Sequence, residues 1–119
     1  MDKLLKDSFV VGAERVAAWA DLLDAINVFP VADGDTGRNL SISLYPLRTG
    51  EADGKKVVEQ LLFSARGNSG NIASRFFSSF YLAESIADLA TRAREGSRWA
   101  WRAVSDPCTG TMLTLFDAL

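Results

Sequence analysis

The chain contains no histidine, and its 119 residues include one cysteine, Cys108. Without histidine, the polypeptide can form neither a Ser–His–Asp triad nor a histidine-ligated zinc site. A single thiol can form neither an internal disulfide nor a Cys–His nucleophilic pair. The chemistry that remains is that of carboxylates, hydroxyls, backbone amides, and the cations of Lys and Arg.

The sequence also lacks an excess of one charge and a long apolar run. Thirteen Lys and Arg face fifteen Asp and Glu, a net charge of -2, and no basic run is present that would neutralise a nucleic-acid backbone. The longest mostly apolar stretch, residues 72–82, contains Arg75 and is too short to cross a bilayer. The first residues do not resemble a signal peptide. We therefore expect a cytoplasmic protein with no membrane span and no nucleic-acid partner.

No strand-length run alternates between apolar and polar residues, so the sequence predicts an all-α fold. An apolar content of 48% in 119 residues is enough for one domain with its own core. Apolar spacings of three and four predict the first helix, with Ser8 near its N-cap, and Gly67 to Gly70 are expected to separate the third helix from the fourth. Gly96 is expected to weaken the fifth helix by about 1 kcal/mol. The six predicted helices span 8–26, 36–45, 55–64, 71–82, 85–105 and 111–119.

Short connections favour antiparallel packing, so alternate connections should meet at the same end of the bundle. One end then collects the segments 27–35, 65–69 and 106–110, whereas the other collects 48–54 and the bend near Glu84. Each segment of the first set contains glycine and leads into a helix N-terminus, where free N–H groups and the helix dipole favour anions.

The first segment places Asp33 and Asp35 on either side of Gly34. The glycine lets the backbone turn so that the two carboxylates converge, and Mg2+ prefers such oxygen ligands together with water and phosphate oxygens. A tight turn with Asp35 or Thr36 as the N-cap of the next helix explains the same residue types without a metal.

The second segment, taken together with Ser64 and Gly70 on either side of it, offers two glycines, two hydroxyls and an amide. These groups come directly before a helix, with Arg66 as a positive neighbour. These are the components of a backbone nest for phosphate oxygens, although the spacing and the lysine of a P-loop are missing. Alternatively, Gly67 ends one helix, and Asn68 or Ser69 caps the next.

In the third segment, residues 107–112, a proline stop followed by a threonine cap explains most of the sequence. Met112 is placed either against an adenine ring or in the core.

Taken together, Asn27-Val-Phe-Pro-Val-Ala-Asp-Gly-Asp-Thr-Gly-Arg-Asn39, Ala65-Arg-Gly-Asn-Ser-Gly70 and Pro107-Cys-Thr-Gly-Thr-Met112 resemble the ATP-binding domain (small subunit, L-type) of the dihydroxyacetone kinase family. The motif Asn-Val-Phe-Pro-Val is most similar to that of the N-terminal domain of fatty acid kinase. The resemblance implies an antiparallel eight-helix barrel with Mg-ATP bound in loops at one end. It covers only the front part of that domain, so residues 1–119 are expected to form a single, shortened nucleotide-binding domain with an incomplete barrel.

By this resemblance, Asp33 and Asp35 are magnesium ligands, and Asn27 falls near a third, acidic ligand position of the family. No catalytic protein nucleophile is implied, because phosphoryl transfer depends mainly on positioning and charge neutralisation. The residues implied to contact the nucleotide are Gly37, Asn39, Arg66, Gly67, Asn68, Ser69, Gly70, Thr111 and Met112.

The implied activity is transfer of the γ-phosphoryl group of ATP to a fatty acid held by a partner protein. One alternative is the ATP-binding subunit of a dihydroxyacetone (glycerone) kinase, whose acceptor is held by a different partner. Another is a non-catalytic remnant that binds a protein partner or magnesium nucleotide without turnover. On either kinase hypothesis, activity requires completion by further helices or by a partner.

Self-association is also expected, because an incomplete barrel leaves the first and last helices without neighbours on one side. The apolar side chains expected to be uncovered are Phe9, Val16, Leu23, Leu113, Leu115 and Phe116.

Overall fold

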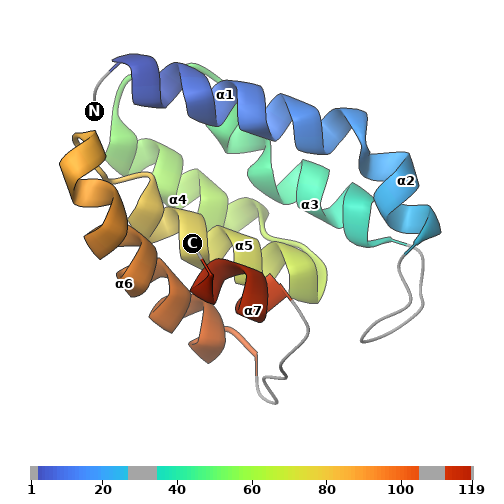
Figure 1. Cartoon of the computed structure of the whole chain (residues 1–119). Helices are drawn as coiled ribbons and strands as arrows, with labels where there is room; N and C mark the ends of the chain where they lie inside the picture. Colours follow the sequence, from blue (N-terminus) through green and yellow to red (C-terminus); the bar gives the residue numbers. More distant parts are fainter. Residues whose placement is uncertain (1–2, 27–34, 105–111, 119) are drawn as a thin grey trace.

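The computed structural model describes residues 3–26, 35–104 and 112–118, and within these ranges it is an all-α bundle without a strand (Figure 1). The predicted fold class is therefore confirmed. None of the described helices is both long enough and apolar enough to cross a membrane. The α-helices are α1 (Lys3–Ala18), α2 (Ala20–Ala25), α3 (Thr36–Leu44), α4 (Gly54–Ser64), α5 (Gly67–Phe80), α6 (Leu89–Arg102) and α7 (Met112–Asp117), and the 3-10 helices are η1 (Tyr45–Arg48) and η2 (Ile86–Asp88).

Helix α5 is the centre of the bundle, since it packs against α3, α4, α6 and α7 (Figure 1). Its Phe76 is fully buried, and the ring stacks on Phe116 of α7 with 4.1 Å between centroids. Phe9 of α1 meets Phe80 and Tyr81 edge to face from the opposite side. Burial raises the pKa of the Tyr81 hydroxyl above 10.0, so this side chain stays neutral at physiological pH. Aromatic side chains in and directly after α5 thus contact both α1, early in the sequence, and α7, late in it.

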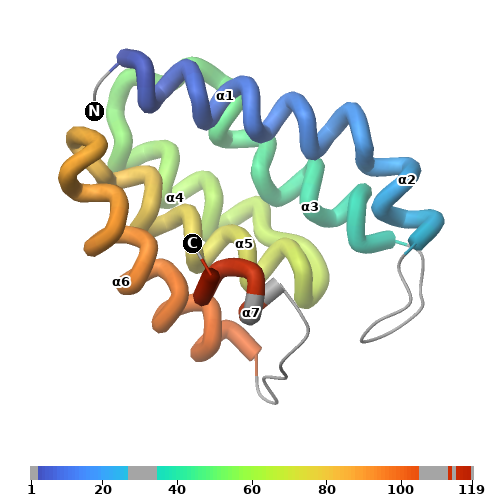
Figure 2. Tube along the Cα trace, viewed as in Figure 1, coloured from blue at the N-terminus to red at the C-terminus, as the bar shows by residue number. Residues whose placement is uncertain are grey.

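The first predicted helix begins earlier than expected and is divided in two. Ser8 lies inside α1 and donates its hydroxyl to the Leu4 carbonyl at 2.8 Å, so its prediction as an N-cap was wrong. Trp19, with φ -99° and ψ 8°, leaves helical geometry and separates α1 from α2, and Figure 2 shows the change of direction there. Neither Gly nor Pro marks this break, so the sequence pattern gave no sign of it.

The third predicted helix ends at Ser64 as expected, but the fourth begins four residues earlier than predicted. Gly67 to Gly70 form the first turn of α5 and do not separate two helices. The break lies at Ala65 and Arg66, whose ψ angles of 131° and 132° are extended. The second predicted helix, 36–45, is close to the observed α3, which ends at Leu44. Pro46 follows within the 3-10 helix η1, where its missing N–H costs no hydrogen bond at a helix start.

Three buried glycines permit close approach between neighbouring helices. A Cβ on Gly37 would overlap the backbone of Ala20, and a Cβ on Gly70 would overlap the hydroxyl of Ser43. A Cβ on Gly96 would lie 2.6 Å from the Phe76 carbonyl oxygen. The helix propensity lost at Gly96 is therefore offset by the close packing of α6 on α5.

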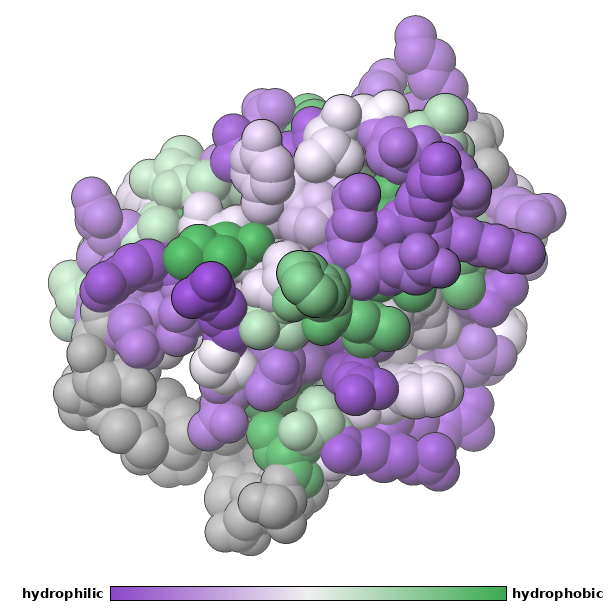
Figure 3. All heavy atoms as spheres, turned by 180° about the vertical axis from the view of Figure 1, so that it is seen from behind, coloured by the Kyte–Doolittle hydropathy of each residue, from purple (hydrophilic) through white to green (hydrophobic). Residues whose placement is uncertain are grey.

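The expectation that two apolar stripes lack neighbours was wrong. Phe9, Val16 and Leu23 pack against the core, and Leu113 and Phe116 are buried. Leu115 is the member of this set that is exposed. On the face drawn in Figure 3, hydrophobic residues form separate patches among hydrophilic ones. The predicted reason for self-association therefore does not hold for these side chains, because all of them but Leu115 pack in or against the core of the chain.

Replacement of Gly96 by Ala should lower the free energy of unfolding by about 1–3 kcal/mol, because the new Cβ forces α5 and α6 apart. Gly12 is the matched control, since a Cβ there meets no atom within 4 Å. Gly12→Ala should stabilise the protein by about 0.5–1 kcal/mol through helix propensity. Urea unfolding of both variants measures the difference, and equal effects would contradict the packing role of Gly96.

Ser74 and Ser43 are both fully buried serines, but their hydroxyls differ in hydrogen bonding. Among the described residues the Ser74 hydroxyl has no partner, whereas the Ser43 hydroxyl accepts the Arg66 N–H at 2.9 Å. Ser74→Ala should therefore raise the melting temperature, and Ser43→Ala should lower the free energy of unfolding by about 1 kcal/mol. Calorimetry of the two variants checks the opposite signs, and destabilisation by Ser74→Ala would contradict this assignment.

Candidate functional site

The structure brings together the beginnings of α3 and α5, which lie at the same end of the bundle (Figure 1). The Ser69 hydroxyl donates to the Thr36 carbonyl at 3.5 Å, a long hydrogen bond between the two first turns. The side-chain nitrogen of Asn39 lies 2.6 Å from the position of a Cβ on Gly67. For these two helices, the predicted convergence of N-termini at one end is confirmed.

Several predicted site residues lie outside the described part of the structure: Asn27, Asp33 and Thr111. The segment 106–110 lies outside it as well, so the place of the third predicted loop stays a prediction. Met112 is the first residue of α7, which packs against α5 and α6.

Asp35 occupies the N-cap position of α3, with φ -124° and ψ 5°, but its side chain makes no capping hydrogen bond to the helix. The carboxylate that binds the first turn comes from α2 instead, where Asp24 Oδ1 accepts the Arg38 N–H at 3.1 Å. The sequence did not reveal this contact, because the two residues are fourteen positions apart. The beginning of α3 therefore has two carboxylates. That of Asp24 accepts the Arg38 N–H, and that of Asp35 belongs to the N-cap residue. Carboxylate oxygens are the ligands that Mg2+ prefers, so this end offers candidate ligands for a cation.

The beginning of α5 has the opposite character. Arg66 is its N-cap residue, with an extended backbone and no side-chain cap, so the alternative of Asn68 or Ser69 as N-cap was wrong. Arg66, Gly67 and Asn68 are exposed. The first backbone N–H groups of a helix have no partner within the helix, and the residue that precedes them in the sequence here is an exposed arginine. This end therefore suits an anion.

The glycines at this site have structural roles of their own. Gly37 and Gly70 are buried, and helix packing against α2 and α3 accounts for both. Gly67 has a φ of 67°, which favours glycine, and it turns the chain into α5 beside Asn39. Contact between these glycines and a phosphate stays a prediction.

Ser43 is a residue of this region that the sequence prediction missed. Its hydroxyl accepts the Arg66 N–H, and its carbonyl accepts the Ser64 hydroxyl at 3.1 Å. Ser43 thereby joins α3 to the end of α4 and the start of α5, and it fixes the backbone of Arg66. The available signal was a serine beside Leu44 on the face of α3 that packs inward, where a buried hydroxyl needs a partner.

The donor set around the two helix ends consists of oxygen and amide groups: Asp24, Asp35, Thr36, Asn39, Asn68 and Ser69. Hard donors of this kind fit Mg2+ and do not favour a soft metal. Within the described ranges, no three acidic or thiol side chains are grouped to hold a metal ion. That Asp33 supplies a further carboxylate to a magnesium ion stays a prediction.

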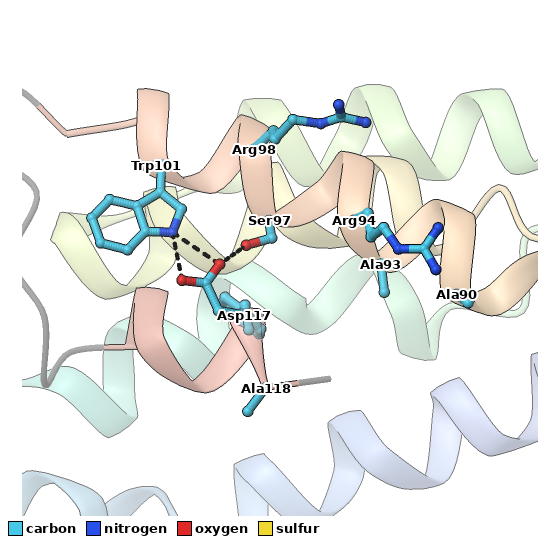
Figure 4. A pocket seen from close by; sticks show the side chains of 9 residues that line it. Ala90, Ala93, Arg94, Ser97, Arg98, Trp101, Asp117 and Ala118 are labelled. Atoms are coloured by element: carbon cyan, nitrogen blue, oxygen red, sulfur yellow. Dashed lines mark hydrogen bonds between the residues drawn. The ribbon is translucent and has the colours of Figure 1, made fainter.

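Two grooves of the described structure lie away from these helix ends. One, of about 530 Å³, lies between α6 and α7 (Figure 4). The other, of about 570 Å³, lies between η1 and α4 and is lined by Tyr45 and Phe63. Neither groove is lined by a predicted site residue.

Comparison with known proteins gives relatives whose function is not described. No protein family model matches the chain. Two uncharacterized proteins of Staphylococcus epidermidis are 37% and 36% identical over 129 residues, and an uncharacterized protein of Staphylococcus aureus (strain USA300) is 38% identical over the same length. Each match covers 95% of this chain and 23% of the relative. The chain thus spans about a quarter of the length of these relatives.

Proposed function

We propose that the chain is the Mg-ATP-binding portion of a two-component kinase that phosphorylates a fatty acid held by a partner protein. The observation that carries the proposal is the adjacency of two helix N-termini with opposite character. The beginning of α3 brings carboxylates, whereas the beginning of α5 brings exposed amides and the Arg66 guanidinium. A magnesium phosphate has the complementary arrangement of charge, with a cation on one side and phosphate oxygens on the other.

In this proposal Asp33 and Asp35 hold Mg2+, with Asn27 close to the same ion. The first turn of α5, from Gly67 to Gly70, binds the phosphates together with Arg66, Gly37 and Asn39. Thr111 and Met112 border the nucleotide. The bound magnesium neutralises phosphate charge, while the residues of the chain hold the γ-phosphate in position for a nucleophile supplied from outside.

The acceptor is assigned to a partner because the family that the motifs resemble holds its acceptor on another subunit or domain. Because the chain matches 23% of its relatives' length, we assign nucleotide binding to it and leave acceptor binding to a partner. The motif Asn-Val-Phe-Pro-Val favours a fatty acid over dihydroxyacetone as the acceptor.

Calorimetric titration with a non-hydrolysable ATP analogue, with and without Mg2+, tests the proposal. Replacing Asp33 and Asp35 by Asn should remove most of the magnesium-dependent affinity and leave the helical circular dichroism nearly unchanged. Asp7→Asn with Asp21→Asn is the matched control, because both residues are exposed on α1 and α2. Unchanged affinity in the loop variant would overturn the magnesium assignment. Absence of any Mg-ATP binding by the wild-type chain would favour the non-catalytic binding module.

Arg66→Ala should weaken ATP about tenfold and AMP much less, because the guanidinium acts on the additional phosphate charge. The packing at this position uses the backbone N–H and carbonyl of Arg66, so removal of the side chain should leave the fold intact. Lys56→Ala, an exposed site on α4, is the control for loss of one positive charge. Isothermal titration with both nucleotides makes the comparison, and equal weakening of ATP and AMP would contradict this role.

A further inference from the structure

The groove between α6 and α7 follows one face of α6. Its α6 wall is built by Ala90, Ala93, Arg94, Ser97 and Trp101, which recur at spacings of three and four residues. A row from residue 90 to residue 101 extends about 17 Å along a helix, because each residue rises about 1.5 Å. The groove is therefore long and straight.

Helix α7 covers only part of this row. Its Asp117 accepts the Trp101 indole N–H at 3.0 Å and also the Ser97 hydroxyl, so α7 is attached beside the later turns of α6 (Figure 4). The six residues of α7 reach about 9 Å, half of the row. Towards the beginning of α6 the groove is lined by the exposed Ala90, whose small side chain lets a second helix approach closely, whereas Ala93 below it is buried in the core.

Two arginines and one carboxylate, that of Asp117, line this groove. Arg94 and Arg98 are exposed, and among the described residues no carboxylate lies within ion-pair distance of either guanidinium. In Figure 4 both side chains extend along α6 without a drawn interaction, whereas Asp117 is turned toward Trp101 and Ser97. Arg94 and Arg98 are four residues apart, which places them on one face of α6 with about 6 Å between their Cβ atoms.

We propose that this groove binds an acidic amphipathic helix of a partner protein. Small apolar residues of that helix pack on Ala90, and two carboxylates at positions i and i+4 pair with Arg94 and Arg98. A nucleic acid is disfavoured, because two arginines on a chain of net charge -2 are too few to neutralise a phosphate backbone. The proposal does not depend on nucleotide binding at the other helix ends.

The test uses two fluorescein-labelled helical peptides of about 18 residues. Both have an alanine face, and one carries Glu at i and i+4 where the other carries Lys. Fluorescence anisotropy with the full chain should show saturable binding of the Glu peptide and at least tenfold weaker binding of the Lys peptide. Arg94→Glu with Arg98→Glu should reverse this preference, and Arg94→Gln with Arg98→Gln should weaken the Glu peptide without favouring the Lys peptide.

Lys55→Glu with Lys56→Glu is the matched control, because it makes the same charge change on α4, away from the groove. This variant should keep the wild-type preference. Equal binding of both peptides, no saturable binding of the Glu peptide, or an equal loss in the lysine control would overturn the proposal. Sedimentation showing wild-type dimers that the arginine substitutions dissociate would also overturn it, since the occupant would then be a second copy of the chain.

Discussion

The contact between Gly70 and Ser43 holds the structure in its present arrangement. The space that a Cβ of Gly70 would fill contains the Ser43 hydroxyl, and the same hydroxyl accepts the Arg66 N–H at the entry to α5. This contact fixes both the distance between α3 and α5 and the backbone at which α5 begins. Because α5 also packs against α4, α6 and α7, its position determines most of the bundle. The candidate site and the aromatic core therefore depend on the same helix.

Two helices that begin side by side would ordinarily present two similar positive ends. In this chain, Asp24 and Asp35 give the beginning of α3 a negative character, whereas Arg66 reinforces the positive character of α5. A cation and an anion can then be held next to each other, which a pair of identically capped helices would not favour. The α6–α7 groove lies elsewhere on the bundle and has its own arginines, so the chain has two separate surfaces with distinct charge patterns.

The fold class could be predicted from the sequence, because apolar residues recur with helical spacing and none alternate over a strand length. The meeting of the α3 and α5 ends followed from the parity of short connections. What failed were details of where helices begin and end: Ser8 bonds within its helix, Gly67 to Gly70 start a helix, and Trp19 ends one. Asp24 and Ser43 were missed because their hydrogen-bond partners are far away in the sequence, at fourteen and twenty-three positions.

The central claim is that the uncapped beginning of α5 binds the phosphates of a magnesium nucleotide. Backbone amide NMR measures this directly, because an added Mg-ATP analogue should shift the resonances of Gly67, Asn68 and Ser69. The beginning of α4 is an internal reference, since the Asp53 side chain already accepts the Lys55 N–H at 3.0 Å. Large shifts are expected at α5 and small ones at α4 if α5 binds the phosphates. Unshifted α5 amides at saturating nucleotide would contradict this claim.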